Sequence, residues 1–231
     1  MKQHMEEKVR INKYLAEQGI TTRRGADVLI EDGHVFINGK KAVLGDRVGS
    51  ADKVEVKGQK TKEYIYMAYN KPIGISTEEI INLLPKEKSQ GLFPVGRLDK
   101  ASHGLILLTN DGRITDRLLN PKFDHEKEYE VKVKGKLRGS FKEKMEKGVR
   151  IEDYKTKPCK VAILGEDRFR VTLTEGKKHQ IRRMCVALFQ EVEDLKRSRI
   201  MNIKMGPVKE GRVRTLEKKE LDEFKKRLGL A

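Results

Sequence analysis

The chain has 231 residues, with 51 Lys and Arg against 35 Asp and Glu, so its formal net charge is +16. This length suits a small module plus a domain of ~100 to 200 residues, and the charge predicts a polyanionic partner. No apolar run approaches the ~18 residues that span a membrane, and MKQHMEEKVR predicts neither a secretory signal nor a transit peptide. We therefore expect a cytoplasmic protein with no membrane partner.

The N-terminal part predicts a small module that begins with two short helices. Ile11 and Leu15 share one helical face. Thr21 or Thr22 can cap the second helix by accepting hydrogen bonds from its unpaired backbone N–H groups. Gly33 can then end this helix in the left-handed conformation.

A hairpin and a further strand complete the module, which we assign to residues 8–57. Asn38-Gly39 joins two apolar runs, and this pair favours a type I′ turn. Residues 52–56 alternate as a half-buried strand does. The polar, glycine-containing residues 58–63 are typical of a linker.

Basic side chains are concentrated on the expected surface of this module, where they could contact successive RNA phosphates: Arg10, Lys13, Arg23, Arg24 and Lys40. Charge on exposed helices is also routine, so a solvated helix face explains the cluster equally well.

Residues 64–231 predict an α+β domain with a largely antiparallel mixed sheet flanked by helices. The strand-like runs are YIYMAY, LILLTN, EYEVKV, PCKVAIL, RFRVTLT and SRIMNIKM. The helical patterns are TEEIINLL, RITDRLL, SFKEKMEK, KKHQIRRMCVALF and LEKKELDEFKKRLG. Several strands are linked by short turns, which disfavours a regular doubly wound parallel sheet.

The two cysteines, Cys159 and Cys185, lie far apart and have no accompanying Cys/His cluster. This pattern argues against a disulfide framework and against a zinc site. We expect two buried thiols and no metal.

Three stretches carry residues beyond those a core needs. Residues 70–76, NKPIGIS, interrupt a strand with proline and glycine; residues 96–104, GRLDKASHG, hold Asp99 among bases; residues 174–184, TEGKKHQIRRM, lead into a basic helix. Each stretch also has an ordinary structural explanation. The first can be a bulge or strand end, Asp99 in the second can be a turn or cap residue, and the third can be a solvated basic face. Taken singly, none of the three establishes a site.

The order of the motifs is more informative. GRLD, KEYEV at 127–131, HQIRRM at 179–184 and LKRSRI at 195–200 together resemble the RsuA-type pseudouridine synthases, which carry an N-terminal S4 RNA-binding module. VRINKYLAEQGITTRRGADVLIEDGHVFINGKKAV resembles that S4 module, and FDHEKEYEV, KPCKV and RSRIMNI resemble the RluF-like branch, which acts on large-subunit ribosomal RNA. The resemblance implies a cofactor-free RNA-modifying isomerase of ribosome biogenesis. Small-subunit ribosomal RNA and tRNA remain alternative substrates.

The resemblance also implies roles for matching residues. Asp99 corresponds to the catalytic aspartate, and Arg97 to the arginine that holds RNA with the target base turned out. Tyr129 corresponds to the tyrosine that stacks on that base, and Arg182 to the basic residue that pairs with the aspartate. Leu195 matches the apolar wall of the pocket.

Other positions are matched less directly. His179 and Arg183, which flank Arg182 in the basic helix, are expected to contact RNA, and Lys71-Pro72 matches a KP motif whose part is mainly structural. The chain departs from the family pattern in a short segment between Ile75 and Leu92, in Lys177, and in the lack of a long basic tail after Leu230. RNA contacts from the shortened segment are therefore in doubt.

The implied reaction is compatible with these residue types. Uridine becomes pseudouridine when the N1–ribose bond breaks, the uracil turns and C5 bonds to the ribose, so no atom is gained or lost. As nucleophile or base Asp99 must be ionised, and a guanidinium such as Arg182 would favour that form. A flipped base costs a few kcal/mol, and stacking on Tyr129 returns ~1 to 3 kcal/mol.

Two other functions stay open at this point. A non-catalytic RNA-binding or ribosome-assembly factor would use the S4-like module and the charge alone. A glycosidic-bond hydrolase would use the same aspartate but release free uracil. We expect a monomer in each case.

Overall fold

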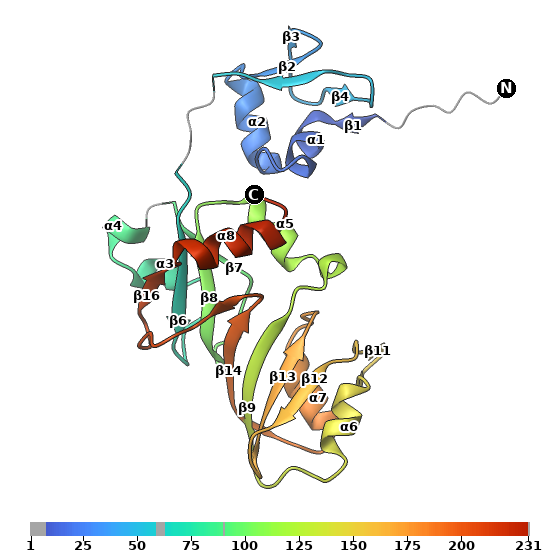
Figure 1. Cartoon of the computed structure of the whole chain (residues 1–231), viewed down its shortest axis with the longest axis vertical. Helices are drawn as coiled ribbons and strands as arrows, with labels where there is room; N and C mark the ends of the chain where they lie inside the picture. The colour runs from blue at the N-terminus through green and yellow to red at the C-terminus, as the bar shows by residue number, and fades with distance from the viewer. Residues whose placement is uncertain (1–7, 59–62, 90, 231) are drawn as a thin grey trace, which may run out of the picture. The chain divides into compact units, whose positions relative to one another are not determined.

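The computed structural model describes residues 8–58, 63–89 and 91–230. The chain divides into two compact units, Met1–Tyr64 and Ile65–Ala231 (Figure 1). Most of the predicted linker 58–63 lies outside the described residues. Within the described residues, no helix has the length and apolar character needed to cross a bilayer.

The first unit packs two helices against short strands. Its elements are β1 (Val9–Arg10), α1 (Ile11–Glu17), α2 (Arg23–Glu31), β2 (Val35–Ile37), β3 (Lys40–Lys41), β4 (Arg47–Val48) and β5 (Val54–Val56). Strands β3, β2 and β5 form one sheet, and β1 pairs with β4. Ile11, Leu15, Ala26 and Ile30 are buried together between the helices and strands. The unit therefore has a core of its own.

Local sequence signals correctly locate the turns of this unit. The Gly25 N–H donates to the Thr22 hydroxyl at 2.9 Å, so Thr22 caps α2. Asn38 and Gly39 have φ values of 50° and 81°, the positive pair that a type I′ hairpin requires. Gly33, at φ 71°, follows the end of α2 as predicted.

The second unit is built on a mixed sheet. Within the described residues it is nine-stranded, in the order β12-β13-β9-β14-β8-β6-β16, with β15 paired to β14 and β7 to β8. The strands are β6 (Tyr66–Lys71), β7 (Phe93–Val95), β8 (His103–Thr109), β9 (Lys127–Val133), β12 (Lys160–Ile163), β13 (Arg168–Leu173), β14 (Val192–Ile200), β15 (Ile203–Lys204) and β16 (Val213–Thr215). Strands β14 and β8 run parallel, while β9 is antiparallel to both β13 and β14. This confirms the predicted α+β fold.

Helices and a small hairpin surround the sheet: α3 (Ile80–Leu83), α4 (Lys86–Ser89), α5 (Arg113–Leu119), η1 (Pro121–Phe123), α6 (Phe141–Glu146), β10 (Arg150–Ile151), β11 (Tyr154–Lys155), α7 (Gln180–Ala187) and α8 (Lys218–Arg227). Figure 1 shows α6 and α7 beside the β9, β12 and β13 part of the sheet. Helix α8 lies by β6, where Lys225 is 5.1 Å from the ring of Tyr66.

Several predicted elements differ in extent from the structure. The helix predicted over KKHQIRRMCVALF begins only at Gln180, because His179 before it is left-handed. Helix α3 covers only part of TEEIINLL, because Thr77 bonds to a distant loop instead of starting a helix. The run SRIMNIKM is not one strand: β14 begins earlier, at Val192, and a turn with Met201 at φ 52° leads into β15.

Two hydrophobic cores support the two halves of this sheet. Phe141, Phe169 and Met184 belong to one, and Tyr69 and Ile106 to the other. Tyr129 of β9 packs against both cores. The middle of the sheet, where β9, β14 and β8 are neighbours, is therefore the place where the two halves meet.

A glycine allows β8 and β14 to approach closely there. Gly104 has φ 101°, and a Cβ atom at this position would lie 2.4 Å from the carbonyl oxygen of Arg197. A side chain would collide with backbone rather than with a movable group, so the glycine of SHG is required by the packing.

Candidate active site

The segment NKPIGIS fixes the turn that carries Asp99. Strand β6 ends at Lys71, whose buried ammonium donates to the carbonyl oxygens of Pro72 at 2.9 Å and Ile75 at 2.8 Å. The Gly74 N–H donates to the carbonyl of Lys100 at 2.8 Å. Lys71 thus holds the loop that follows it, and Gly74 in that loop braces the residue next to Asp99.

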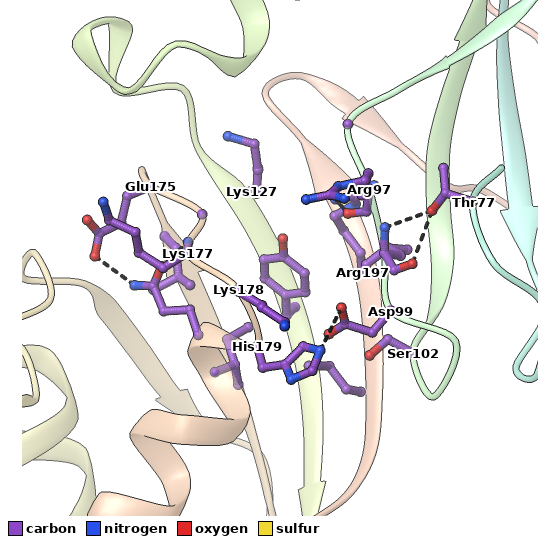
Figure 2. A pocket seen from close by; sticks show the side chains of 18 of the residues that line it. Thr77, Arg97, Asp99, Ser102, Lys127, Glu175, Lys177, Lys178, His179 and Arg197 are labelled. Atoms are coloured by element: carbon purple, nitrogen blue, oxygen red, sulfur yellow. Dashed lines mark hydrogen bonds and ion pairs between the residues drawn. The ribbon is translucent and has the colours of Figure 1, made fainter. Parts of the chain in front are cut away.

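A buried threonine holds the same turn from its other side. The Thr77 hydroxyl donates to the Leu98 carbonyl and accepts from the Leu98 N–H, both at 3.0 Å (Figure 2). The Ser102 N–H donates to the Asp99 carbonyl at 3.0 Å. The Asp99 backbone is therefore held on both sides, while its side chain stays 40% exposed.

The opposite wall is the loop before α7. Glu175 is buried and accepts from the Lys157 N–H at 2.9 Å, from the Gln180 amide at 2.7 Å and from the Tyr154 hydroxyl. This network locks the loop that ends at His179, whose φ is 50°. The loop is thereby shaped to present His179.

Asp99 and His179 meet across the hollow between these walls. Figure 2 shows the two side chains pointing toward one another, and the His179 Nε2 lies 3.3 Å from the Asp99 Oδ1. His179 is thus brought to Asp99 from a motif 80 residues further along the chain.

A cavity of about 520 Å³ surrounds this pair. Predicted residues that line it are Arg97, Asp99, Tyr129, His179 and Leu195, together with Lys177. Residues that sequence reasoning missed also line it: Thr77, Lys127, Glu175, Lys178 and Arg197. Its size is in the range of ~300 to 1,000 Å³ that small-molecule sites occupy, so it can receive a single nucleotide base.

The predicted ion pair between Arg182 and Asp99 is not made. The Arg182 Nη2 donates to the Ala101 carbonyl at 2.7 Å and to the Ser102 hydroxyl at 3.3 Å, and Nη1 lies 3.4 Å from the Val192 carbonyl. The reason is local: the turn after Asp99 offers its own carbonyl to the guanidinium. Arg182 therefore holds the Asp99 turn rather than its carboxylate.

Arg183 lies apart from the cavity. Its guanidinium pairs with Glu152 at 2.5 Å and contacts the Lys178 carbonyl at 3.4 Å.

Lys100 is 3.7 Å from Glu79, and 66% of its side chain is exposed, in keeping with an exposed charge. Neither contact places these side chains at the Asp99 carboxylate.

The predicted RNA-binding residues of the first unit all lie on its helices and strands. Arg10 ends β1, Lys40 begins β3, and Arg23 and Arg24 form the first turn of α2. These four side chains are exposed, and Lys13 of α1 is 3.7 Å from Glu17. The structure therefore leaves them accessible to a polyanion.

Arg197 is the most unusual residue of the cavity wall. It is 3% exposed; its Nε donates to the Leu105 carbonyl at 2.7 Å, and its Nη1 is 3.4 Å from the Arg97 carbonyl. Its Nη2 has no hydrogen-bond partner among the described residues. On β14 it lies directly opposite Tyr129 of β9. Arg197 thus links three parts of the site.

Positive charge accumulates around these groups. Burial lowers the pKa of Lys71, and the Asp99 carboxylate partly opposes that shift. Burial also lowers the pKa of Lys127, and the Arg197 guanidinium lowers it further. The cavity therefore suits a ligand that brings negative charge or carbonyl oxygens.

The cysteines take no part in the cavity. Cys185 is fully buried and Cys159 partly buried, and burial raises the pKa of both thiols to about 12. In the part of the chain that the structure describes, no three His, Cys, Asp or Glu side chains gather as metal ligands.

Comparisons with known proteins identify the family of the chain. Residues 59–187 match the family model of RNA pseudouridylate synthases, and residues 9–54 match that of S4 domains. The chain is 44% identical over 230 residues to the dual-specificity RNA pseudouridine synthase RluF of Escherichia coli K12, covering 94% of this chain and 79% of that protein.

Two further relatives extend the comparison. The ribosomal large subunit pseudouridine synthase B of Bacillus subtilis is 34% identical, covering 94% of this chain and 95% of that protein. A crystal structure of a pseudouridylate synthase superposes with a TM-score of 0.70 and 30% identity, covering 93% and 98% of the two chains. The chain therefore belongs to the RsuA-type RNA pseudouridine synthases, isomerases that here carry an N-terminal S4 domain.

Proposed function

We propose that this enzyme converts uridine to pseudouridine in ribosomal RNA, specifically 23S rRNA, with Asp99 as its catalytic carboxylate and without a cofactor. The observation that carries the proposal is the Asp99 side chain, held on a braced turn at a cavity that also contains Tyr129 and cationic groups.

The cavity supports distinct tasks for its residues. The flipped uracil stacks on Tyr129, with Leu195 as the apolar wall, and the partly exposed Asp99 carboxylate faces the ribose and the base. Arg97, on the same turn, holds the RNA around the vacated stack. The Asp99 carboxylate is open to solvent and contacts His179, and as a carboxylate it can serve either as nucleophile or as base.

Cationic side chains of the cavity can also stabilise the negative charge that develops on the uracil during the reaction. Breaking the N1–ribose bond leaves electrons on the uracil, whose carbonyl oxygens then become better acceptors. Lys127, Lys178 and Arg197 line the space that the base would occupy. Donors already in position around developing charge are an effective source of rate enhancement.

The choice of ribosomal RNA rests on charge and on relatives. The S4 unit exposes Arg10, Arg23, Arg24 and Lys40, which can neutralise backbone phosphates while the second unit selects the uridine. The Bacillus subtilis relative is a large-subunit enzyme by name. We further propose a cytoplasmic monomer, with residues 8–57 and 64–231 as its RNA-binding and catalytic parts.

A direct experiment identifies the substrate. Purified enzyme is incubated separately with unmodified transcripts of 23S rRNA, 16S rRNA and a tRNA mixture, and pseudouridines are mapped by carbodiimide-dependent reverse-transcription stops. We expect a stop at a single uridine of the 23S transcript. Stops confined to 16S rRNA or tRNA would replace the 23S assignment.

A further inference from the structure

The chain segment between Pro121 and Lys127, two residues that line the cavity, carries two aromatic rings that the chemistry above does not use. Phe123 ends η1 and His125 follows it, and their ring centroids lie 5.9 Å apart with planes inclined by 17°. Asp124, between them, has φ 51°, a left-handed conformation that aspartate tolerates better than most residues. We name Phe123 and His125 the aromatic ledge.

Phe123 is one of the large hydrophobic side chains that are exposed. Its exposed fraction is 41%. The ammonium of Lys122 lies 4.7 Å from its ring centroid. A large exposed aromatic ring beside a flexible cation is a combination typical of surfaces that stack nucleobases.

The ledge is adjacent along the chain to residues that line the cavity. Leu119 and Pro121 before it and Lys127 after it all line the cavity. Lys127 and Tyr129 project to one face of β9, ~7 Å apart along the strand. The Lys127 ammonium reaches back to the His125 carbonyl at 3.3 Å. RNA that extends past Lys127 could therefore reach the ledge.

The electrostatic setting favours a base rather than an acidic peptide or a phosphate alone. Burial lowers the pKa of His125, and the Lys127 ammonium lowers it further. The His125 ring is thus largely neutral at pH 7.5 and offers a flat apolar face. The carboxylate of Asp124 pairs with Lys157 at 2.6 Å, which keeps its charge engaged beside the ledge.

We propose that the aromatic ledge is a second nucleobase site, on which a base flanking the target uridine of the substrate RNA stacks, with Lys122 contacting the adjoining phosphate. This inference rests on the proposed function, because it takes the Asp99 cavity as the position of the target uridine. It adds a substrate contact outside that cavity.

The test compares Phe123→Leu, which removes the aromatic ring but keeps an apolar side chain, with Phe123→Tyr, which keeps the ring. Phe189→Leu is the matched control, because Phe189 is 75% exposed and also lies near a cation, Arg138 at 4.9 Å, yet is not in the cavity lining. Thermal unfolding of each full-length variant checks its fold.

Two readouts are measured for each protein. The first is the Kd for single-stranded RNA heptamers that have a central uridine and 2-aminopurine at one flanking position, with quenching of the 2-aminopurine as the sign of stacking. The second is kcat/KM on unmodified 23S transcript. Phe123→Leu should lose quenching at one flanking position and weaken RNA binding about five-fold or more, while Phe123→Tyr and Phe189→Leu match the wild type.

Unchanged quenching and Kd in Phe123→Leu would overturn the ledge, as would equal losses in Phe189→Leu, which would indicate general apolar attraction. Failure of the proposed function is a separate result: the wild-type enzyme would then form no pseudouridine in 23S transcript, whatever the quenching shows.

Discussion

Arg182 donates from Nη2 to the carbonyl oxygen of Ala101 at 2.7 Å, two residues beyond Asp99. The same guanidinium reaches the Ser102 hydroxyl. Arg182 thereby connects α7 to the turn that carries the Asp99 carboxylate. We therefore expect Arg182 to position Asp99 through the backbone.

Arg182→Met should therefore lower kcat much more than it lowers RNA affinity. Losing hydrogen bonds from a charged donor costs ~1.5 to 3 kcal/mol, so kcat should fall about ten-fold or more while Kd stays within about two-fold. Arg183→Met is the control, since Arg183 pairs with Glu152 instead. Steady-state kinetics with filter-binding titrations separate the two effects. Equal losses in rate and affinity would make Arg182 a phosphate contact.

His179→Gln should have a modest effect. The imidazole lies 3.3 Å from Asp99, but the two side chains are 48% and 40% exposed, and exposed pairs contribute ~0.2 to 1 kcal/mol. We expect kcat/KM to fall about two- to five-fold in single-turnover assays. A loss as large as that of an Asp99 variant would instead give His179 a direct part in the chemistry.

Arg197→Met should impair both stability and rate. The change leaves the Leu105 carbonyl without its 2.7 Å donor in a buried place, at a cost of ~1 to 3 kcal/mol in the free energy of unfolding. It also frees the Arg97 carbonyl, so kcat should fall even where the protein is fully folded. Urea titration and single-turnover rates measure these effects. Wild-type kcat in the folded variant would limit Arg197 to a structural part.

The two thiols should resist alkylation in the native state. Because burial raises the pKa of Cys159 and Cys185 to about 12, both remain protonated at pH 8, and the thiolate is the reactive form. Iodoacetamide followed by mass spectrometry should modify neither cysteine at pH 8 but both in guanidinium chloride. Rapid native modification of Cys185 would contradict its burial.

Much of the fold follows from local patterns in the sequence. RITDRLL forms α5 over the predicted residues, and Asn38-Gly39 forms the predicted turn, because these elements depend on neighbouring residues alone. The sequence pattern predicts one strand where the structure has the paired strands β14 and β15. The turn between them is not recognisable in the sequence, because its left-handed residue, Met201, is neither glycine nor asparagine.

The site was less predictable because long-range contacts make it. Asp99, Tyr129, Leu195 and His179 were named from motifs, and the structure brings them to one cavity. Nothing local distinguishes Arg197 from the other basic residues of LKRSRI, which are less deeply buried; its burial depends on β8 and β14 approaching at Gly104. The partner of Arg182 was mispredicted for a similar reason, because a backbone carbonyl leaves no trace in the sequence.

Asp99→Asn tests the central claim most directly. The amide keeps nearly the same shape but supplies no negative charge, so it can serve neither as nucleophile nor as base. Wild-type and variant enzymes, matched for folding and RNA affinity, are incubated with unmodified 23S transcript, and pseudouridine is mapped by carbodiimide. The account predicts a site-specific stop with the wild type and none with Asp99→Asn. Normal pseudouridine formation by the variant would contradict it.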